Sequence, residues 1–315
     1  MNPHLEAIVF EQTGASDISS KKLIQELWSG YGQILKIGLL NSKYESIIVK
    51  HINLPEVSNH PRGWGTDYGH QRKLKSYKVE EHWYQTYSKR SKARIPQFIA
   101  SAEIDNQKII LLEDLDISGY HIRKISVGWN EVKNCLQWLA KFHASYMQSE
   151  TLGLWAIGTY WHLDTRPQEL SVLQDKRLKK AAKAIDHKLN SCKYMTVVHG
   201  DAKLANFCFS PQGDIAGLDF QYVGGGCGMK DVAYLIGSCF REKECERLES
   251  EILDTYFSYL QNELDEPNNE LEEEWRHMYR VAWADFHRFL KGWSPGHWKV
   301  NSYSEKVTND VIDRL

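Results

Sequence analysis

The chain has 315 residues, of which 42% are hydrophobic and 25% charged, and its formal net charge is −2 at pH 7. These values are typical of a globular protein with one large domain or two modest ones. They exclude the basic excess that nucleic acid or an anionic membrane surface would call for, so we expect neither as a partner.

The N-terminus and the cysteines indicate a cytoplasmic protein. The segment MNPHLEAIVFEQ lacks the basic stretch and apolar core of a signal peptide. No apolar run approaches the ~20 residues of a transmembrane helix. The six cysteines form no C-x-x-C pair, as expected of thiols in a reducing compartment rather than of a disulfide or zinc framework.

The first third of the chain is predicted to be rich in strands. A short amphipathic helix comes first, over 20–29, with Ser20 as its N-cap and Gly30 after its end. The elements that follow are strands at 33–40 and 46–52, a helix at 71–90, and strands at 96–104 and 108–112.

The segment 55–70, PEVSNHPRGWGTDYGH, is predicted to be a long loop, because turn-forming residues occur throughout it. Two interpretations stay open. The loop is a lid over a bound substrate, with Arg62 placed to meet an acidic group, or it is a packed insertion.

The remainder of the chain is predicted to be mostly helical. Helices are expected at 127–148, 174–190, 230–240, 245–263 and 270–292, with short strands at 195–199, 207–210 and 214–219. This pattern predicts an α+β, bilobal protein, with a β-rich N-lobe over 1–115 and a larger helical C-lobe over 116–315.

The sequence VVHGDAKLANFCF, residues 197–209, contains the most informative chemistry. Asp201 and Asn206 lie in a loop between two short strands, and a third strand delivers Asp219 at its end. Phosphoryl transfer needs a carboxylate that accepts the proton of the attacking hydroxyl and oxygen ligands that hold Mg²⁺ on the phosphates. Asp201 suits the first task, and Asn206 with Asp219 suits the second.

The pattern H-G-D-x-x-x-x-N followed by L-D-F resembles the small-molecule kinase branch of the protein-kinase-like fold. That branch includes aminoglycoside phosphotransferases, choline kinases and the ecdysteroid-kinase-like family, and the segment YRVAWADFHRFLKGW resembles its bacterial members. Protein kinases carry H-R-D and D-F-G. Here Gly200 replaces the arginine, Gln221 replaces the glycine and A-P-E is missing, which argues against a regulated protein kinase.

The resemblance implies an ATP site built largely from the first third of the chain. In this family a glycine-bearing hairpin covers the phosphates, a lysine on the third strand contacts them, and a glutamate on the next helix pairs with that lysine. Backbone groups of an acidic hinge meet the adenine. The matching residues are Gly30, Gly32 and Gly38, then Lys50, then Glu80 or Glu81, with Glu80 preferred, and then Glu113 and Leu115.

In the C-lobe the resemblance implies that Lys203 neutralises the transferred phosphate, although a solvated lysine is the alternative. His199 and His143 are expected to brace the catalytic loop or the core. Asp231 is expected to be a helix N-cap, and to tie down the catalytic loop as well.

Asp285 is an anomaly in the predicted helix at 270–292, because it falls on the apolar face. With Trp283 and Trp298 nearby, it is a candidate for holding a cationic or polyhydroxyl acceptor. The alternative is a structural ion pair with Arg288 or Arg280.

The sequence as a whole predicts an ATP- and Mg²⁺-dependent phosphotransferase acting on a hydroxyl of a small molecule. Amino alcohols, steroid-like alcohols, sugars and aminoglycosides all remain as acceptors. The alternative is a non-catalytic nucleotide-binding pseudokinase or scaffold, which has no chemical need for Lys50, Asp201, Asn206 and Asp219 together.

Overall fold

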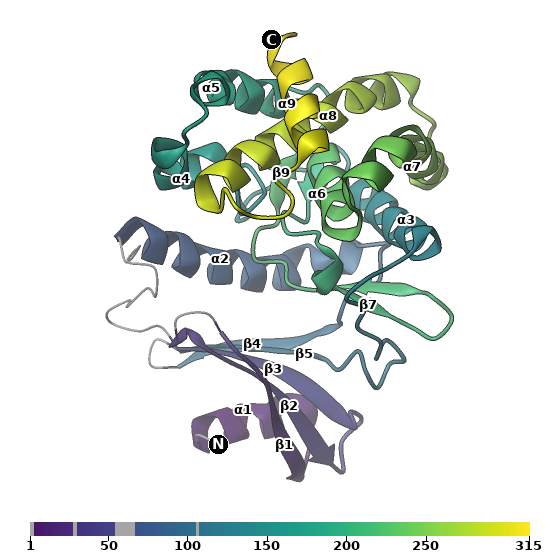
Figure 1. Cartoon of the computed structure of the whole chain (residues 1–315). Coiled ribbons are helices and arrows are strands. Elements are labelled where there is room, and N and C mark those ends of the chain that lie inside the picture. The colour runs from purple at the N-terminus through teal and green to yellow at the C-terminus, as the bar shows by residue number, and fades with distance from the viewer. Residues whose placement is uncertain (1–2, 28–29, 54–66, 105–106) are drawn as a thin grey trace.

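A computed structural model of the chain describes residues 3–27, 30–53, 67–104 and 107–315. Figure 1 shows a β-sheet at one end of the molecule and a larger group of helices at the other. This is the β-rich N-lobe and helical C-lobe that the sequence predicts. We propose that the lobes divide near residue 115, because the last strand of the sheet ends at Glu113.

The N-lobe sheet has five antiparallel strands in the order β1-β2-β3-β5-β4. The strands are β1 (Asp17–Glu26), β2 (Gly32–Leu40), β3 (Ser46–Asn53), β4 (Phe98–Ile104) and β5 (Gln107–Glu113). In the centre, Lys50 of β3 lies opposite Ile34 of β2 and Ile110 of β5. The central position of β3 fixes Lys50 on a rigid element.

The helix predicted over 20–29 is wrong, because residues 20–26 belong to the edge strand β1. Its residues pair with β2 from Asp17 opposite Leu40 to Glu26 opposite Gln33. Leu23 and Ile24, which suggested the apolar face of a helix, are about half exposed, at 49% and 51%. Backbone pairing with β2 therefore decides the structure, and no apolar face is buried here.

The helix α1 (Pro3–Thr13) was not predicted from the sequence. It buries Leu5, Ile8 and Val9 in a cluster with side chains of β2, β3 and β5. Figure 1 shows α1 on the side of the sheet that faces away from the C-lobe. The sheet is thus covered on both faces.

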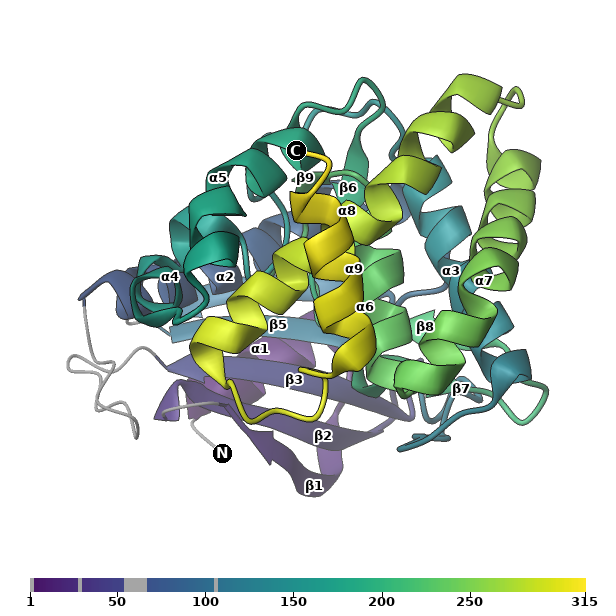
Figure 2. The same ribbon diagram turned by 45° about the horizontal axis from the view of Figure 1, so that its top comes forward.

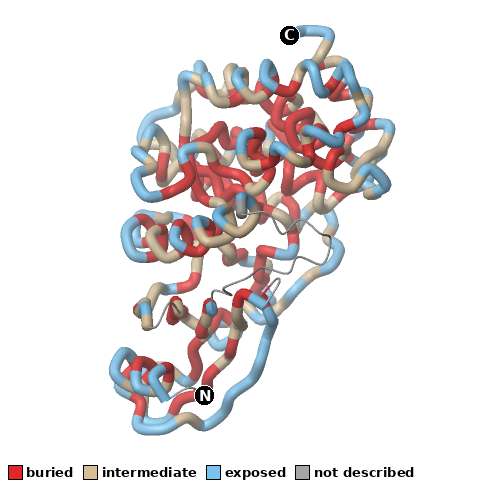
Figure 3. Tube along the Cα trace, turned by 90° about the vertical axis from the view of Figure 1, so that its left-hand side faces the viewer, coloured by how far each residue is buried: buried red, intermediate tan, exposed pale blue. Residues whose placement is uncertain are grey.

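The helix α2 (Asp67–Thr86) lies between the sheet and the C-lobe, where a helix over 71–90 was predicted (Figures 1 and 3). Trp83 of α2 is fully buried and stacks on Phe220, with ring centroids 3.7 Å apart and planes 7° apart. Phe220 directly follows Asp219, so α2 packs against the segment that carries a candidate metal ligand.

The C-lobe contains the predicted elements in the predicted order. Its longer helices are α3 (Trp129–Ser145), α5 (Lys176–Asn190), α6 (Met229–Cys239), α7 (Glu242–Glu263), α8 (Asn269–Trp293) and α9 (Ser302–Ile312), and α4 (Pro167–Val172) is short. Its strands are β6 (Thr196–Val198), β7 (Phe207–Phe209), β8 (Ile215–Gly217) and β9 (Gly224–Gly226). Of these elements, α4, β9 and α9 were not predicted. Figure 3 shows the buried core concentrated where these helices meet.

In the part of the chain that the structure describes, no helix has both the length and the apolar character needed to span a bilayer. Most of the predicted loop 55–70, including Arg62, lies outside the described residues.

Candidate active site

The catalytic loop begins where β6 ends, at His199, and its turn requires a glycine. Gly200 has φ +78°, and a Cβ atom there would lie 2.1 Å from the carbonyl oxygen of Tyr222. An L-residue is strained in this conformation and would also clash with that backbone. This explains why the arginine of the protein-kinase motif is replaced here.

Asp231 ties down the catalytic loop from α6, as the sequence suggested. Its carboxylate accepts hydrogen bonds from the backbone N–H groups of His199, at 2.5 Å, and Gly200, at 2.9 Å. Nε2 of His143 is 3.2 Å from the same carboxylate. The prediction that Asp231 is the N-cap is wrong, because Gly228 occupies that position and Asp231 lies in the first turn.

The His199 ring braces the loop instead of pointing into the cleft. Its Nε2 donates to the carbonyl oxygen of Leu218 at 2.8 Å, and its Nδ1 accepts from the backbone N–H of Asp201 at 3.2 Å. The ring therefore joins the Asp201 loop to the residue that precedes Asp219. The bracing role predicted for His199 is confirmed.

Asp201 is only 5% exposed and is held by two side chains. Its Oδ2 accepts from Lys203 Nζ at 2.8 Å and from Asn206 Nδ2 at 3.1 Å. Its Oδ1 is buried and accepts no hydrogen bond of standard geometry from the described residues, although the Tyr234 hydroxyl lies close to the carboxylate. Burial raises the pKa of Asp201, and the nearby charge of Lys203 opposes this increase. A buried carboxylate oxygen without such a hydrogen bond is a site for a proton donor that arrives with a substrate.

Asp219 lies just after β8 with φ +68°, a left-handed conformation that aspartate tolerates better than most residues. Its Oδ1 is 2.7 Å from Gln221 Nε2 and 3.4 Å from Lys50 Nζ. Burial opposes ionisation, but the charges of Lys50 and Lys73 outweigh it and lower the pKa of Asp219. The carboxylate is therefore favoured in its ionised form.

Lys50 forms a buried ion pair with Glu80, at 2.5 Å between Nζ and Oε2. Glu81 pairs instead with Lys108, at 2.8 Å. Of the two glutamates that the sequence offered, the preferred Glu80 is therefore the partner of Lys50. Burial disfavours the ammonium group of Lys50, yet Glu80 and Asp219 outweigh this effect and raise its pKa. Lys50 is therefore a fixed cation in the cleft.

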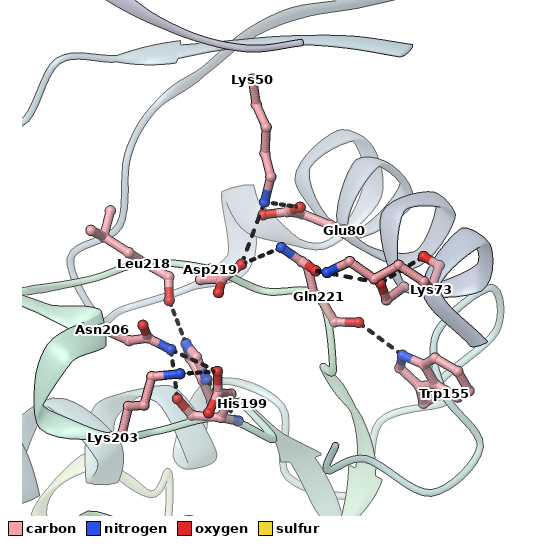
Figure 4. Close-up of polar contacts among 12 residues, drawn as sticks. Lys50, Lys73, Glu80, Trp155, His199, Lys203, Asn206, Leu218, Asp219 and Gln221 are labelled. Carbon is pink, nitrogen blue, oxygen red and sulfur yellow. Dashed lines mark hydrogen bonds and ion pairs between the residues drawn. The ribbon is translucent and has the colours of Figure 1, made fainter. Parts of the chain in front are cut away.

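Gln221 is a site residue whose role the sequence did not indicate. Its Nε2 donates to Asp219, while its Oε1 accepts from Lys73 of α2 at 2.8 Å (Figure 4). Its backbone carbonyl accepts from Trp155 Nε1 at 2.8 Å. Lys73 is 148 positions away in sequence, so no local pattern pointed to this contact.

The oxygen donors fit the Mg²⁺ ion that the resemblance implies. Asn206 uses Nδ2 to contact Asp201, which leaves its Oδ1 for a cation near Asp219 (Figure 4). One carboxylate and one amide oxygen suit Mg²⁺, which takes the rest of its ligands from phosphates and water. Within the described ranges, no group of three or more His, Cys, Asp and Glu could hold a metal ion by itself.

The residues expected at the adenine and phosphates lie at the end of β5 and at the start of β2. Leu115 is buried against Cys208 and Ala216 of the C-lobe. The Glu113 side chain is held by Arg94, which leaves only backbone groups for a base. Gly32 has φ +126°, and a Cβ atom there would lie 2.0 Å from the carbonyl of His51, whereas the exposed Gly30 has open space around it.

Of the three residues expected at an acceptor pocket, Trp283 and Trp298 line one small pocket with Lys299, and Asp285 is not part of its lining. Asp285 is 2% exposed and pairs with Arg288, at 2.8 Å, and with Trp161 Nε1, at 3.0 Å. The alternative of a structural ion pair therefore describes Asp285. Trp283 is buried and donates to Ser304 at 3.0 Å, whereas Trp298 is 40% exposed.

The segment 156–269, which carries Asp201, Asn206 and Asp219, matches the family model of the ecdysteroid kinase-like family. A protein from Ralstonia eutropha JMP134, described as an aminoglycoside phosphotransferase, shares the fold with a TM-score of 0.53 and 12% identity, over 98% of this chain and 94% of that one. The fold is that of the small-molecule kinases.

Two further solved structures share this kinase-like fold. Aminoglycoside phosphotransferase APH(4)-Ia, in complex with ADP and hygromycin B, matches with a TM-score of 0.52 and 11% identity over 98% of each chain. Macrolide 2′-phosphotransferase MphH from Brachybacterium faecium matches with a TM-score of 0.50 and 11% identity, over 98% of this chain and 97% of that one. No curated protein shows a significant match to the sequence.

Proposed function

We propose that the protein transfers the γ-phosphate of ATP, in the presence of Mg²⁺, to a hydroxyl group of a small molecule. The observation that carries this proposal is the state of Asp201. Its Oδ1 is buried with only the Tyr234 hydroxyl close by and no hydrogen bond of standard geometry among the described residues, while Oδ2 is fixed by Lys203 and Asn206. A carboxylate held in this way can accept a proton from a hydroxyl group that enters the cleft.

In the proposed reaction, Asp201 orients the acceptor hydroxyl and takes its proton at Oδ1. The acceptor oxygen forms a bond to the γ-phosphorus as the bond from that phosphorus to the bridging oxygen breaks, and ADP leaves. Lys50, held by Glu80, contacts the α- and β-phosphates, and Lys203 neutralises the transferred phosphate. When bound, Mg²⁺ supplies charge neutralisation at the phosphates, with Asp219 and Asn206 as its protein ligands.

The structural neighbours support a nucleotide-dependent reaction. APH(4)-Ia was solved with ADP and hygromycin B, and aminoglycoside 2′-phosphotransferase-IIIa was solved with GDP. A cytoplasmic location fits the six cysteines, all of which are free thiols.

The experiment compares the wild type with Asp201→Asn. We expect ADP formation from ATP to fall roughly 10²- to 10⁴-fold, since the general base is lost, while MgATP affinity changes little. Calorimetric titration with MgATP and a coupled assay for ADP measure the two properties separately. The control is Asp265→Asn, because Asp265 is exposed and lies outside the site.

The same comparison decides between an enzyme and a pseudokinase. If the wild type binds MgATP but forms no ADP above the level of Asp201→Asn with any hydroxyl acceptor, the chain is a nucleotide-binding scaffold. If ADP formation is equal in the two proteins and well above background, Asp201 is not the base.

A further inference from the structure

The connection between α8 and α9 contains an exposed tryptophan, Trp298, and two cationic side chains lie close to its ring. The guanidinium of Arg241 is 3.9 Å from the ring centroid of Trp298, and Nζ of Lys299 is 5.6 Å from the same centroid. Within the described ranges, neither side chain forms an ion pair with an aspartate or glutamate. Burial lowers the pKa of His297, and the charges of Lys299 and Arg241 lower it further.

Lys299 is the more informative of the two, because its ammonium group is partly buried among aromatic rings. Besides Trp298, its Nζ lies 5.1 Å from the ring centroid of Tyr234 and 5.5 Å from that of Phe286. Burial lowers the pKa of Lys299 to about 8, and the charge of Lys203 contributes to the decrease. Aromatic faces compensate only part of the cost of removing an ammonium group from water.

The position of Lys299 is built into the fold. Its backbone carbonyl accepts from Ser304 Oγ at 2.9 Å, and the same hydroxyl accepts from Trp283 Nε1 at 3.0 Å. Trp283, which the sequence suggested for the acceptor pocket, therefore supports the backbone of Lys299 through Ser304. This hydrogen bond fixes the backbone of Lys299, and the three aromatic rings surround its ammonium group.

Lys299 also lies near the catalytic loop. Figures 1 and 2 show the connection between α8 and α9 beside one end of α6, the helix that carries Tyr234. The Tyr234 ring contacts that of Tyr160, with centroids 5.6 Å apart, and the Tyr160 backbone N–H donates to Gly200 at 3.1 Å. Burial lowers the pKa of Lys299, and the charge of Asp201 partly opposes this decrease.

Among the described residues, the carboxylates near these cations are engaged by other groups: Glu242 accepts from the Ser302 hydroxyl at 2.9 Å, and Glu244 accepts from the backbone N–H of Arg241 at 3.3 Å. Asp285 is neutralised by Arg288, and Asp201 is already paired with Lys203. Like charges placed together without a counter-ion destabilise the free protein, and an anion that binds between them removes this cost.

We propose that the phosphate acceptor carries an anionic group, a carboxylate or a phosphate ester, which binds Lys299 and Arg241 beside Trp298 while the acceptor hydroxyl reaches Asp201. This inference rests on the proposed function and adds the charge of the substrate. It argues against the cationic acceptor that the sequence suggested at Asp285.

The test uses protein saturated with MgADP, so that the nucleotide phosphate site is filled before a probe is added. The probes are hydroxy acids, each paired with its uncharged amide, and sugar phosphates, each paired with the free sugar. Thermal denaturation and calorimetric titration report binding. We expect the anionic member of a pair to bind at least tenfold more tightly, and the two kinds of probe distinguish a carboxylate from a phosphate ester.

Variants test whether Lys299 and Arg241 bind the anionic probe. Lys299→Met and Arg241→Met should each weaken binding of the preferred anion about tenfold or more, and Lys299→Arg should retain most of it. The matched control is Lys243→Met, because Lys243 is exposed on α7 close to Arg241 and its loss changes the net charge equally. Retained MgADP binding shows that Lys299→Met is folded, and the exposed Arg241 gives an independent test.

The proposal is overturned if charged and uncharged probes bind equally, if no anionic probe binds the MgADP complex, or if Lys299→Met and Lys243→Met behave alike. MgADP binding is measured first. Its failure in the wild type would contradict the proposed function itself, and would be distinguished in this way from failure of the anion site.

Discussion

Asp219 receives contacts from two side chains that α2 helps to position. Lys50, which pairs with Glu80 of α2, approaches its Oδ1 to 3.4 Å, and Gln221, which accepts from Lys73 of α2, donates to the same oxygen at 2.7 Å. Both connections hold Oδ1, which leaves Oδ2 for the metal. The placement of α2 therefore sets the orientation of this carboxylate.

Replacing Gln221 with alanine should weaken Mg²⁺-dependent nucleotide binding while leaving Asp219 in place. A hydrogen bond to a charged group contributes about 1.5–3 kcal/mol, so we expect the Mg²⁺ concentration for half-maximal ATP binding to rise about tenfold or more. Titration of Mg²⁺ at fixed ATP measures this, with Gln212→Ala as the control because Gln212 is exposed. An unchanged Mg²⁺ requirement in Gln221→Ala would show that the amide does not position Asp219.

The negative charge of Asp201 should lower the stability of the folded protein at neutral pH. Burial raises the pKa of its carboxyl group, so the ionised form is disfavoured in the folded state. The protonated carboxyl group adds to the free energy of unfolding, and this contribution is fully present below the ordinary aspartate pKa of about 3.9. The contribution is lost as the pH rises through the raised pKa of the folded state.

The neutral variant Asp201→Asn should therefore have a larger free energy of unfolding than the wild type at pH 7, by a difference on the order of 1 kcal/mol. The difference should narrow as the pH is lowered toward 4. Urea denaturation at several pH values measures it. A variant less stable than the wild type at pH 7 would mean that the contacts with Lys203 and Asn206 outweigh the cost of burial.

At this scale, part of the site could be predicted from the sequence. Asp201, Asn206 and Asp219 are close in the chain, and the structure joins Asn206 to Asp201 directly and the Asp201 loop to Leu218, beside Asp219, through His199. The contacts of Gln221 with Lys73, and the aromatic surroundings of Lys299, depend on segments far apart in sequence. Only the packing of α2 and α8 against the catalytic segment creates them.

The secondary-structure elements show where local patterns decide and where tertiary contacts override them. The helices from α3 to α8 that were predicted have long apolar faces, and the structure confirms them. The segment 20–29 has only a short apolar face, and pairing with β2 makes residues 20–26 a strand instead. The helix α1 gave too weak a pattern to be predicted, although its Leu5 and Val9 are almost fully buried.

The helix α1 should matter for stability and not for nucleotide binding, because it packs on the face of the sheet away from the C-lobe (Figure 1). Leu5 is 2% exposed, so Leu5→Ala should lower the free energy of unfolding by about 2–5 kcal/mol. The affinity of the folded variant for MgATP should be unchanged.

Urea denaturation and calorimetric titration measure the two properties, with Leu40→Ala, at a residue 46% exposed, as the control. A loss of MgATP affinity in folded Leu5→Ala would contradict the separation of α1 from the site.

The whole molecule brings Lys50 and Glu80 of the N-lobe together with Asp219 of the C-lobe at the contact between the sheet, α2 and the catalytic segment. The buried pair Lys50–Glu80 and the stacked pair Trp83–Phe220 connect these parts. A nucleotide that binds here contacts both lobes at once, and this arrangement predicts that MgATP stabilises the entire fold.

The most direct measurement is thermal denaturation of the wild type with MgATP, and with ATP plus a chelator that removes Mg²⁺. A ligand at ~100 times its dissociation constant adds about 2.7 kcal/mol to the free energy of unfolding, which gives a clear increase in the midpoint temperature. We predict this increase with MgATP and a much smaller one without Mg²⁺. No increase at millimolar MgATP would contradict the assignment of Lys50, Asn206 and Asp219 to a magnesium–nucleotide site.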